Sequence, residues 1–572
     1  MEIIDLAIMI GLIILIGISQ IQRYIRERKG KKTEELSKID EFCEKHYKKI
    51  WILLLIIFLV TVVYKFGELP TYLSVDEAAG IYDAINIANY GVGRYLDSYP
   101  IYIPNFGGGQ SALWCYLAVI CVKLFGSNIM ACRLPFLLMY AVAIIASYLL
   151  VSKSKNKKTA LLFTFLIMTC PWNIVNARQA LDCNLYAGML MLDLFLMNRA
   201  KKNYQYIIAG ISVGITLYTY CLSWITMPIF LAIWAIYMLY IKKIKIRQLI
   251  VFAIPIAILA TPLIYFLLLN YGIFNQTQFG IITVPKLTLF RSSEIAISNI
   301  WKKGLLSLST IFTEKNTIYP MYILLFIIGY IVSIKKTIQK IKKKEYSVTA
   351  LMVIAFTTIF IGLLIASVPT SNKANALYIP ILYFVTIGIL EIFKNSKNLF
   401  IMCIVLICIS FTHFEYKYYT DYAYNVNPSS IYDDNSFYKL VEKLEKNEKT
   451  ANMQKRVLII KIEPDIYQAL VTKMSPYEYN EKAVRENVGN NIVKTTKVGN
   501  YYYYNMIFHS ERFLKESFKN KNEIIIITNI FLKMIEDYGI DLEKYQKVEY
   551  RDLYILVEKD MNISLGDIIK DE

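Results

Sequence analysis

Long apolar stretches recur through the first 413 residues of the chain, and short loops rich in Lys and Arg separate them. Several of these stretches approach the about 20 residues that a helix needs to cross a bilayer. The pattern predicts about a dozen membrane-spanning segments. They are 3–19, 51–66, 134–151, 159–177, 183–198, 204–222, 224–240, 248–270, 319–334, 347–367, 375–393 and 398–413. The predicted fold class is therefore a polytopic α-helical membrane protein.

The last part of the chain, residues 414–572, has a different pattern. Short apolar runs alternate with amphipathic stretches, which is typical of a small α/β domain. We expect strands at 457–460, 496–505, 523–528 and 548–557, and helices at 466–473 and 531–538. The run Tyr501–Tyr504 could stack on carbohydrate, but an aromatic strand packed in the core of its own domain is the favoured interpretation.

The basic loops set the predicted topology, because cytoplasmic loops hold the excess of Lys and Arg. The loop 20–49 is dense in both, which places the N-terminus and the residues after segment 51–66 outside. Segment 3–19 has no basic region before it and no convincing cleavage site, so we read it as a retained anchor. The predicted domains are an N-terminal anchor helix with a basic cytoplasmic loop (1–49), a multi-span domain with a large first external loop at 67–133 (50–413), and an extracytoplasmic α/β domain (414–572).

The stretch 110–126 is ambiguous in this topology, because it is short and contains Lys123. The next segment, 134–151, ends in the lysine-rich loop 152–158, which should be cytoplasmic. If both stretches crossed, that loop would be outside. We therefore predict that 110–126 lies at the membrane interface or is re-entrant.

Composition agrees with a membrane protein and narrows its partners. The chain has 572 residues, of which 56% are hydrophobic, and a formal net charge of +18. Its mean hydropathy is +0.41. The basic residues sit in loops between apolar runs, so we expect the lipid bilayer as a partner and no nucleic acid. The predicted location is the cell membrane, with several spans.

The cysteines and histidines limit the possible chemistry. The nine cysteines are scattered and form no CxxC pair, so neither a disulfide framework nor a zinc site is indicated. Only three histidines are present, His46, His413 and His509, so a histidine base is not expected. No His or Cys metal site is evident; a divalent cation as cofactor stays open.

Charged residues at the predicted outer ends of separate spans are the candidate site. They are Asp76, Glu77, Arg178, Asp182 and Lys373, with Arg291 in the long external loop 271–318. Ionisable groups near a membrane are costly and usually mark function. Brought together, a carboxylate could act as general base for a hydroxyl, and a cation could hold a phosphate.

Each candidate has a structural alternative. Asp76 could cap a helix over 77–90, and Arg178 could form an ion pair with Asp182 four residues on. Glu77 lies about 100° around the helix from Asp76, so the two should not face one site. Lys373 could be an interfacial lysine. For Asp193, inside a span, a buried structural hydrogen bond or a water contact is favoured.

At these residues the chain resembles bacterial glycosyltransferases of the GT-C fold, of the protein-mannosyltransferase and aminoarabinose-transferase type (family 39-like). The resemblance covers roughly residues 50–390 and depends on the order of several short motifs. They are Asp76-Glu77 followed by Tyr82, Leu124-Phe-Gly126 before Arg133-Leu-Pro135, Arg178-Gln-Ala-Leu-Asp182, Tyr218-Thr-Tyr220 before Pro228, and Asn372-Lys373 before Tyr378-Ile-Pro380.

The resemblance implies an inverting transferase that uses a polyprenyl-phosphate sugar, with the active site on the outer face. It implies catalysis by Asp76, with Asp182 as a second acid and Lys373 and Arg178 as phosphate contacts. The other expected substrate contacts in these motifs are Glu77, Tyr82 and Tyr378. Aminoarabinose transferases also have a Glu-Lys pair late in the first loop, which contributes to metal and phosphate binding. Here the region 106–110 reads Phe-Gly-Gly-Gly-Gln and carries no charge, which departs from that pattern.

The function expected from the sequence is a membrane glycosyltransferase, a hexosyl or pentosyl transferase. It would move sugar from a polyprenyl-phosphate donor to an extracytoplasmic acceptor, namely a cell-surface glycan, lipid or protein. The alternative is a transporter or flippase of lipid-linked sugars. A transporter should place charged or helix-breaking residues near mid-span in two repeated halves, whereas the charges here cluster at the ends of spans.

Overall fold

The computed structural model describes residues 3–28, 36–105, 107–288, 300–314, 316–366, 370–422, 434–459, 463–487, 493–504, 518, 522–551, 553–561, 563 and 565–566. Within them, nine helices are long and apolar enough to cross a membrane. They are α1 (Ile3–Arg28), α2 (Ser37–Val63), α5 (Ile129–Ser152), α10 (Ser223–Tyr240), α11 (Ile246–Asn270), α13 (Tyr322–Lys342), α14 (Val348–Ala366), α15 (Asn375–Ile392) and α16 (Lys397–Lys417). The predicted polytopic helical class is confirmed.

Three further segments that were expected to span are shorter helices. α6 (Lys157–Met168), α8 (Asn184–Arg199) and α9 (Asn203–Thr216) have 12, 16 and 14 residues. The expected segment 159–177 is divided because α6 ends before Pro171, where the short helix α7 (Pro171–Asn176) begins. A proline at the first helical position favours such a new start.

The ambiguous stretch forms α4 (Leu113–Phe125), a helix of 13 residues. At 1.5 Å per residue it is about 20 Å long, shorter than the about 30 Å hydrocarbon core. It is therefore shorter than a spanning helix, as α6, α8 and α9 also are, and the interfacial or re-entrant placement of 110–126 stays a prediction.

Glycines let two pairs of these helices approach closely. A Cβ on Gly210 of α9 would lie 2.3 Å from the carbonyl oxygen of Phe252 on α11. A Cβ on Gly329 of α13 would lie 1.8 Å from the carbonyl oxygen of Phe384 on α15. Small residues at such contacts are typical of membrane bundles, because lipid provides no hydrophobic drive between helices.

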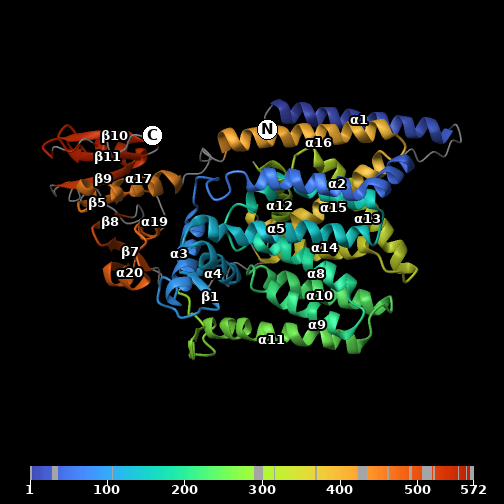
Figure 1. Cartoon of the computed structure of the whole chain (residues 1–572), viewed down its shortest axis with the longest axis horizontal. Helices are drawn as coiled ribbons and strands as arrows, with labels where there is room; N and C mark the ends of the chain where they lie inside the picture. Colours follow the sequence, from blue (N-terminus) through green and yellow to red (C-terminus); the bar gives the residue numbers. More distant parts are fainter. Residues whose placement is uncertain are drawn as a thin grey trace.

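The helix α3 (Val75–Tyr90) and the hairpin of β1 (Tyr102–Asn105) and β2 (Gly108–Ser111) lie at one end of the bundle (Figure 1). The N-cap of α3 is Ser74, whose hydroxyl accepts the Glu77 N–H at 3.2 Å. The alternative that Asp76 caps this helix is therefore wrong, because Asp76 lies one residue inside it. α3 ends at Gly91, where φ is +75°.

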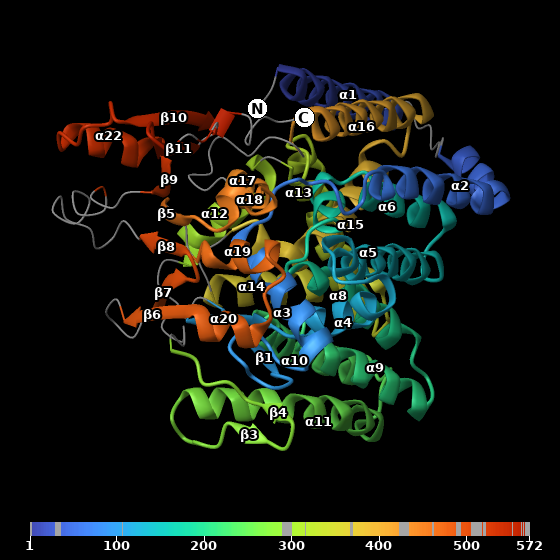
Figure 2. The same ribbon diagram turned by 60° about the vertical axis from the view of Figure 1, so that its left-hand side comes forward.

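The C-terminal domain lies at the same end of the bundle and contains a seven-stranded sheet, which runs from β10 to β6 in Figure 2. The sheet order is β10-β11-β9-β5-β8-β7-β6, and β5 is parallel to both of its neighbours. Its strands are β5 (Gln454–Leu458), β6 (Ala483–Asn487), β7 (Val493–Val498), β8 (Tyr501–Tyr504), β9 (Glu523–Thr528), β10 (Tyr545–Tyr550) and β11 (Leu553–Glu558). The expected strands 496–505 and 548–557 are in fact hairpins, with turns at Gly499 and Arg551, where φ is +57° in both.

The remaining elements lie within or between these parts. They are β3 (Gln278–Phe279), β4 (Ile282–Thr283), α12 (Ile300–Thr313), η2 (Asn372–Ala374), η3 (Tyr418–Tyr422), α17 (Asp434–Lys446), α18 (Glu448–Ala451), α19 (Asp465–Val471), α20 (Pro476–Lys482) and α22 (Asn529–Asp537).

The tyrosine run in β8 belongs to the domain core. Tyr501 and Tyr503 are buried, and their hydroxyls donate to Glu445 Oε1 at 2.6 Å and to Gln468 Oε1 at 2.5 Å. The favoured interpretation of this segment, an aromatic strand packed in its own domain, agrees with the structure.

Candidate functional site

Three predicted site residues converge beside the hairpin β1–β2. Asp76 is exposed in the first turn of α3, where the helix dipole favours an acid. Asp182 lies in the turn before α8, and Lys373 lies in η2 before α15; both are half-buried. We call these three residues the open face.

The hairpin connects the two carboxylates. Asn105 Nδ2 donates to Asp76 Oδ1 at 3.0 Å, and the Ser111 N–H donates to Asp182 Oδ2 at 2.9 Å. Burial is the main cause that raises the pKa of Asp182 to about 7, and the charge of Asp76 raises that pKa further. The N–H groups of Ser111 and Cys183 act in the opposite direction. The two acids are therefore close enough to influence each other.

Lys373 is linked to the same place through Cys221, in the turn between α9 and α10. Burial raises the pKa of the Cys221 thiol to about 12; Asp182 raises that pKa further, and Lys373 lowers it. Asp182 and Lys373 are therefore both within electrostatic range of this thiol. The structure thus brings together two acids and a cation from distant parts of the chain. Asp76 and Lys373 are 297 positions apart in the sequence.

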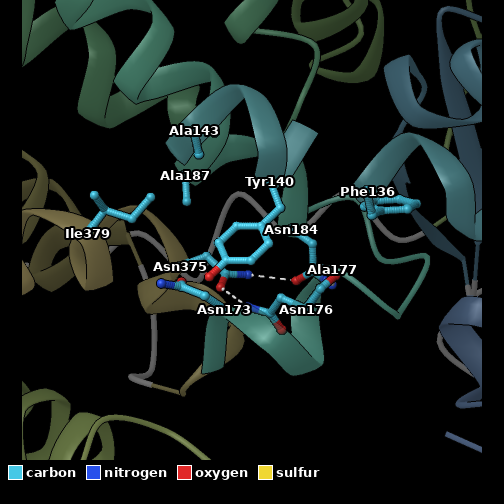
Figure 3. Close-up of a pocket in the computed structure, with 11 residues that line it drawn as sticks. Phe136, Tyr140, Ala143, Asn173, Asn176, Ala177, Asn184, Ala187, Asn375 and Ile379 are labelled. Carbon is cyan, nitrogen blue, oxygen red and sulfur yellow. Dashed lines mark hydrogen bonds between the residues drawn. The ribbon is translucent and has the colours of Figure 1, made fainter. Parts of the chain in front are cut away.

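A network of buried and half-buried asparagines fixes this arrangement (Figure 3). Asn375 Oδ1 accepts from Trp172 Nε1 and from Asn176 Nδ2, the latter at 2.7 Å. Asn375 Nδ2 donates to Asn184 Oδ1 at 2.9 Å. Asn184 lies two positions after Asp182, and Asn375 lies two positions after Lys373. The hydrogen bond between the two asparagines therefore holds the segments that carry Asp182 and Lys373 side by side.

These asparagines line a cavity of about 20 Å³, enough for about one water molecule. Asn176 Oδ1 has no hydrogen-bond partner within the described part of the chain, so a water there would satisfy it. Sequence reasoning missed this network. The available signal was the presence of amides at the ends of apolar segments, where each must find a partner.

The Glu77 carboxylate is buried and paired within the protein. It is 1% exposed, and its carboxylate accepts from Arg133 Nε at 2.8 Å and from Arg133 Nη2 at 3.2 Å. The Ala180 N–H also donates to it at 2.8 Å. Glu77 therefore joins α3 to α5 and to the turn before α8, and it points away from Asp76, as the helical spacing predicted.

The Arg178 guanidinium also forms its hydrogen bonds within the protein. Its guanidinium donates to the carbonyl oxygens of Thr61, Val62, Tyr64, Lys65 and Leu69, and to the Tyr419 hydroxyl. Two of these carbonyls, those of Thr61 and Val62, belong to the C-terminal end of α2, which needs donors. These bonds join Arg178 to the end of α2 and to the segment that follows it. We call Glu77, Arg133 and Arg178 the sealed seam.

The two predicted tyrosine contacts are buried as well. Tyr82 is 2% exposed, and its hydroxyl donates to the Met474 carbonyl at 3.0 Å. The Tyr378 ring stacks on Trp172, with centroids 5.0 Å apart. Arg291, in the external loop, lies outside the described residues.

An apolar groove lies beside the open face. It has a volume of about 420 Å³. Its lining residues are Tyr99, Ile101, Ala112, Leu113, Tyr116, Tyr218, Ile281 and Ile282. Ala112 follows Ser111, which donates to Asp182, so the groove begins next to that carboxylate.

The described residues contain no group of three or more His, Cys, Asp or Glu side chains placed to hold a metal ion. Asp193, the acid within the bundle, accepts from the hydroxyls of Ser212 at 2.5 Å and Thr216 at 2.7 Å. The favoured structural role of Asp193 agrees with these bonds.

Comparison with known proteins places this geometry in a wider context. Residues 111–266 match the sequence model of the dolichyl-phosphate-mannose-protein mannosyltransferase family. No relative is found among curated protein sequences. The structure of ArnT from Cupriavidus metallidurans bound to undecaprenyl phosphate is similar, with a TM-score of 0.52 and 10% identity over 89% of this chain and 97% of that chain. The apo state of the same protein gives a TM-score of 0.51 and 10% identity over 92% and 99% of the two chains. The chain is thus a multi-pass membrane protein with the GT-C fold.

Proposed function

We propose that this protein is a membrane glycosyltransferase that moves a sugar from a polyprenyl-phosphate donor to an acceptor hydroxyl outside the cytoplasm. The observation that carries the proposal is the convergence of Asp76, Asp182 and Lys373 at one end of a GT-C fold. The matched mannosyltransferase family and the undecaprenyl phosphate bound to ArnT support the donor class.

The proposed reaction is a single displacement. The acceptor oxygen forms a bond to the anomeric carbon, and the bond from that carbon to the phosphate oxygen breaks. Its electron pair leaves with polyprenyl phosphate, and the sugar is inverted. Asp76 takes the proton of the acceptor hydroxyl, because it is exposed and oriented by Asn105. Lys373 stabilises the charge that develops on the phosphate.

Asp182 has a supporting role in this proposal. Its pKa, raised to about 7, means that it is partly protonated near neutral pH. A protonated carboxyl can donate to an oxygen of the donor, and the same environment limits repulsion between Asp182 and the phosphate. Glu77, Tyr82, Arg178 and Tyr378 act as positioning residues, because the protein already occupies their polar atoms or rings.

The apolar groove is the proposed place of the first isoprenoid units. It contains no charged side chain, begins beside Asp182 and is lined by aliphatic and tyrosine side chains. A lipid tail there would place its phosphate toward Lys373. The acceptor site and the extracytoplasmic orientation are further parts of the proposal, which rest on the positive-inside pattern of the loops.

The test is transfer of radiolabelled sugar from polyprenyl-phosphate sugars to envelope acceptors, in membranes with matched expression. Wild type should transfer, and Asp76→Asn should lose activity by about 10²–10⁴-fold. Glu536→Gln, which removes an exposed acid on α22, is the matched control and should behave as wild type. Equal transfer by Asp76→Asn and wild type would contradict the role of Asp76. Lipid-linked sugar that wild type moves across vesicles without transfer would favour the flippase alternative.

A further inference from the structure

The C-terminal domain packs against the segment that carries Asp76. α19 packs against α3 in the region where Figure 2 places the two side by side. The Tyr467 hydroxyl donates to the Leu73 carbonyl, and the Tyr82 hydroxyl donates to the Met474 carbonyl, both at 3.0 Å. One hydrophobic core contains residues of both parts. The domain is therefore continuous with the segment that carries the proposed base.

Arg94 lies at the centre of this junction and is 1% exposed. Its Nε lies 3.4 Å from Asp83 Oδ2, and its Nη2 donates to Asn105 Oδ1 at 2.6 Å. Its Nη1 lies 3.9 Å from Glu463 Oε2, which belongs to the C-terminal domain. One guanidinium thus joins the first loop, the hairpin and the C-terminal domain.

The contact with Arg94 determines how Asn105 is oriented. Because the amide oxygen of Asn105 accepts from Arg94, its NH₂ group must point the other way, and it donates to Asp76 Oδ1 at 3.0 Å. A chain of contacts therefore runs from Glu463 through Arg94 and Asn105 to Asp76.

We propose that Arg94 and Glu463 are positioning residues of the proposed transferase, and that the C-terminal domain contributes Glu463 to the support of its active site. Glu463 holds Arg94, Arg94 holds Asn105, and Asn105 presents its amide hydrogen to the Asp76 carboxylate. This inference rests on the proposed function for its kinetic consequences, while the contacts themselves do not depend on it.

The environment of Glu463 gives this chain of contacts a pH dependence. Burial raises the pKa of Glu463 to about 7; Arg94 lowers it, and the neighbouring acids raise it. The charged and titratable groups around Glu463 are Arg94, Asp465, Asp83, Asp76, Tyr95, Tyr479 and Lys494. Glu463 is therefore ionised at pH 8 and holds Arg94 best there, whereas at pH 6 it is largely protonated.

The kinetic test compares Glu463→Gln with wild type in the full-length protein. At pH 8 the variant should lose about tenfold in kcat with little change in KM, because Arg94 would lose the opposite charge that lies 3.9 Å from its Nη1. At pH 6 the loss should shrink below about twofold, because the wild-type carboxyl is then neutral too. The Asn105→Ala variant should show the kcat loss at both pH values. In the Asn105→Ala background, Glu463→Gln should cause no further loss.

The matched control is Glu523→Gln. It breaks the buried pair with Arg456 in the sheet of the same domain, where Arg456 Nε lies 2.7 Å from Glu523 Oε2. We expect it to lower thermal stability without the pH-dependent loss in kcat. If Glu463→Gln only destabilised the domain, the two variants would behave alike and the proposal would be overturned.

A second measurement needs no turnover. Labelling of Asp76 by dicyclohexylcarbodiimide at pH 8, read by mass spectrometry, reports how readily this carboxylate is protonated. Loss of the Asn105 donor should raise the pKa of Asp76 and speed labelling, so both Asn105→Ala and Glu463→Gln should be faster than wild type. Slower labelling in Glu463→Gln would indicate a direct charge effect and overturn positioning through Asn105. If wild type transfers no sugar, the proposed function fails, and this measurement still decides the role of Glu463.

Discussion

The open face and the sealed seam use the same kinds of residue for different purposes. Asp76 and Glu77 are neighbours in the sequence, yet Asp76 is exposed while Glu77 is buried against Arg133. Asp182 and Arg178 lie four positions apart, yet Arg178 is bound by the end of α2 while Asp182 faces the hairpin. A charge at the end of a span therefore indicates function only where its side chain stays at least partly exposed, as those of Asp76, Asp182 and Lys373 do.

The largest expected difference between the two regions is at the neighbouring acids. Asp76→Asn should lower kcat by about 10²–10⁴-fold with little change in the melting temperature. Glu77→Gln should instead destabilise the protein by about 3–5 kcal/mol, because Arg133 would lose its buried partner. Transfer assays and thermal unfolding in detergent measure both effects. A pattern in which Glu77→Gln is stable but inactive would reverse the assignment.

The next effect concerns Arg178. Arg178→Lys should cost about 3 kcal/mol or more, since an ammonium group cannot reach the several carbonyls that the planar guanidinium bonds. The matched control is Arg247→Lys, at an exposed position in the first turn of α11, where almost no change is expected. Thermal unfolding of both variants tests this. If Arg178→Lys were as stable as wild type but bound the donor more weakly, Arg178 would be a substrate contact.

A smaller effect should appear in the pH dependence of stability at Asp182. Because its pKa rises to about 7 in the folded state, the folded protein binds its proton more tightly than the unfolded chain does. Its contribution to stability is therefore lost as pH rises from about 4 to about 7. Asp182→Asn should remove this dependence, so the variant should gain about 1 kcal/mol or more relative to wild type between pH 5 and pH 8. Parallel stability curves for the two proteins would contradict the raised pKa.

The smallest expected effect concerns the groove next to the open face. Leu113→Trp should fill part of it and raise KM for a long-chain donor about three- to tenfold, with little effect on a donor that has a short isoprenoid chain. Leu124→Trp, on the same helix at a position that is 71% exposed, is the control. Equal KM changes for the long and the short donor would argue against lipid in the groove.

Much of the architecture could be predicted from the sequence because it depends on local patterns. Apolar length and basic loops predicted the helical membrane class, and the short length of 110–126 predicted a short helix, which α4 is. Alternating apolar runs located the strand 523–528, which β9 matches in both bounds. The hairpins β7–β8 and β10–β11 were missed, because their turns depend on single residues with positive φ, Gly499 and Arg551.

The candidate residues were also visible in the sequence, but their division into two regions was not. The chain determined that acids and cations stand at the ends of spans, because apolar length and charge are properties of each segment. Only the tertiary structure decided which charges remain accessible. That depends on partners far along the chain, such as Arg133 for Glu77, the end of α2 for Arg178, and Asn105 for Asp76. The physical reason is that a buried charge must be paired, and the partner that pairs it is set by packing and not by spacing along the chain.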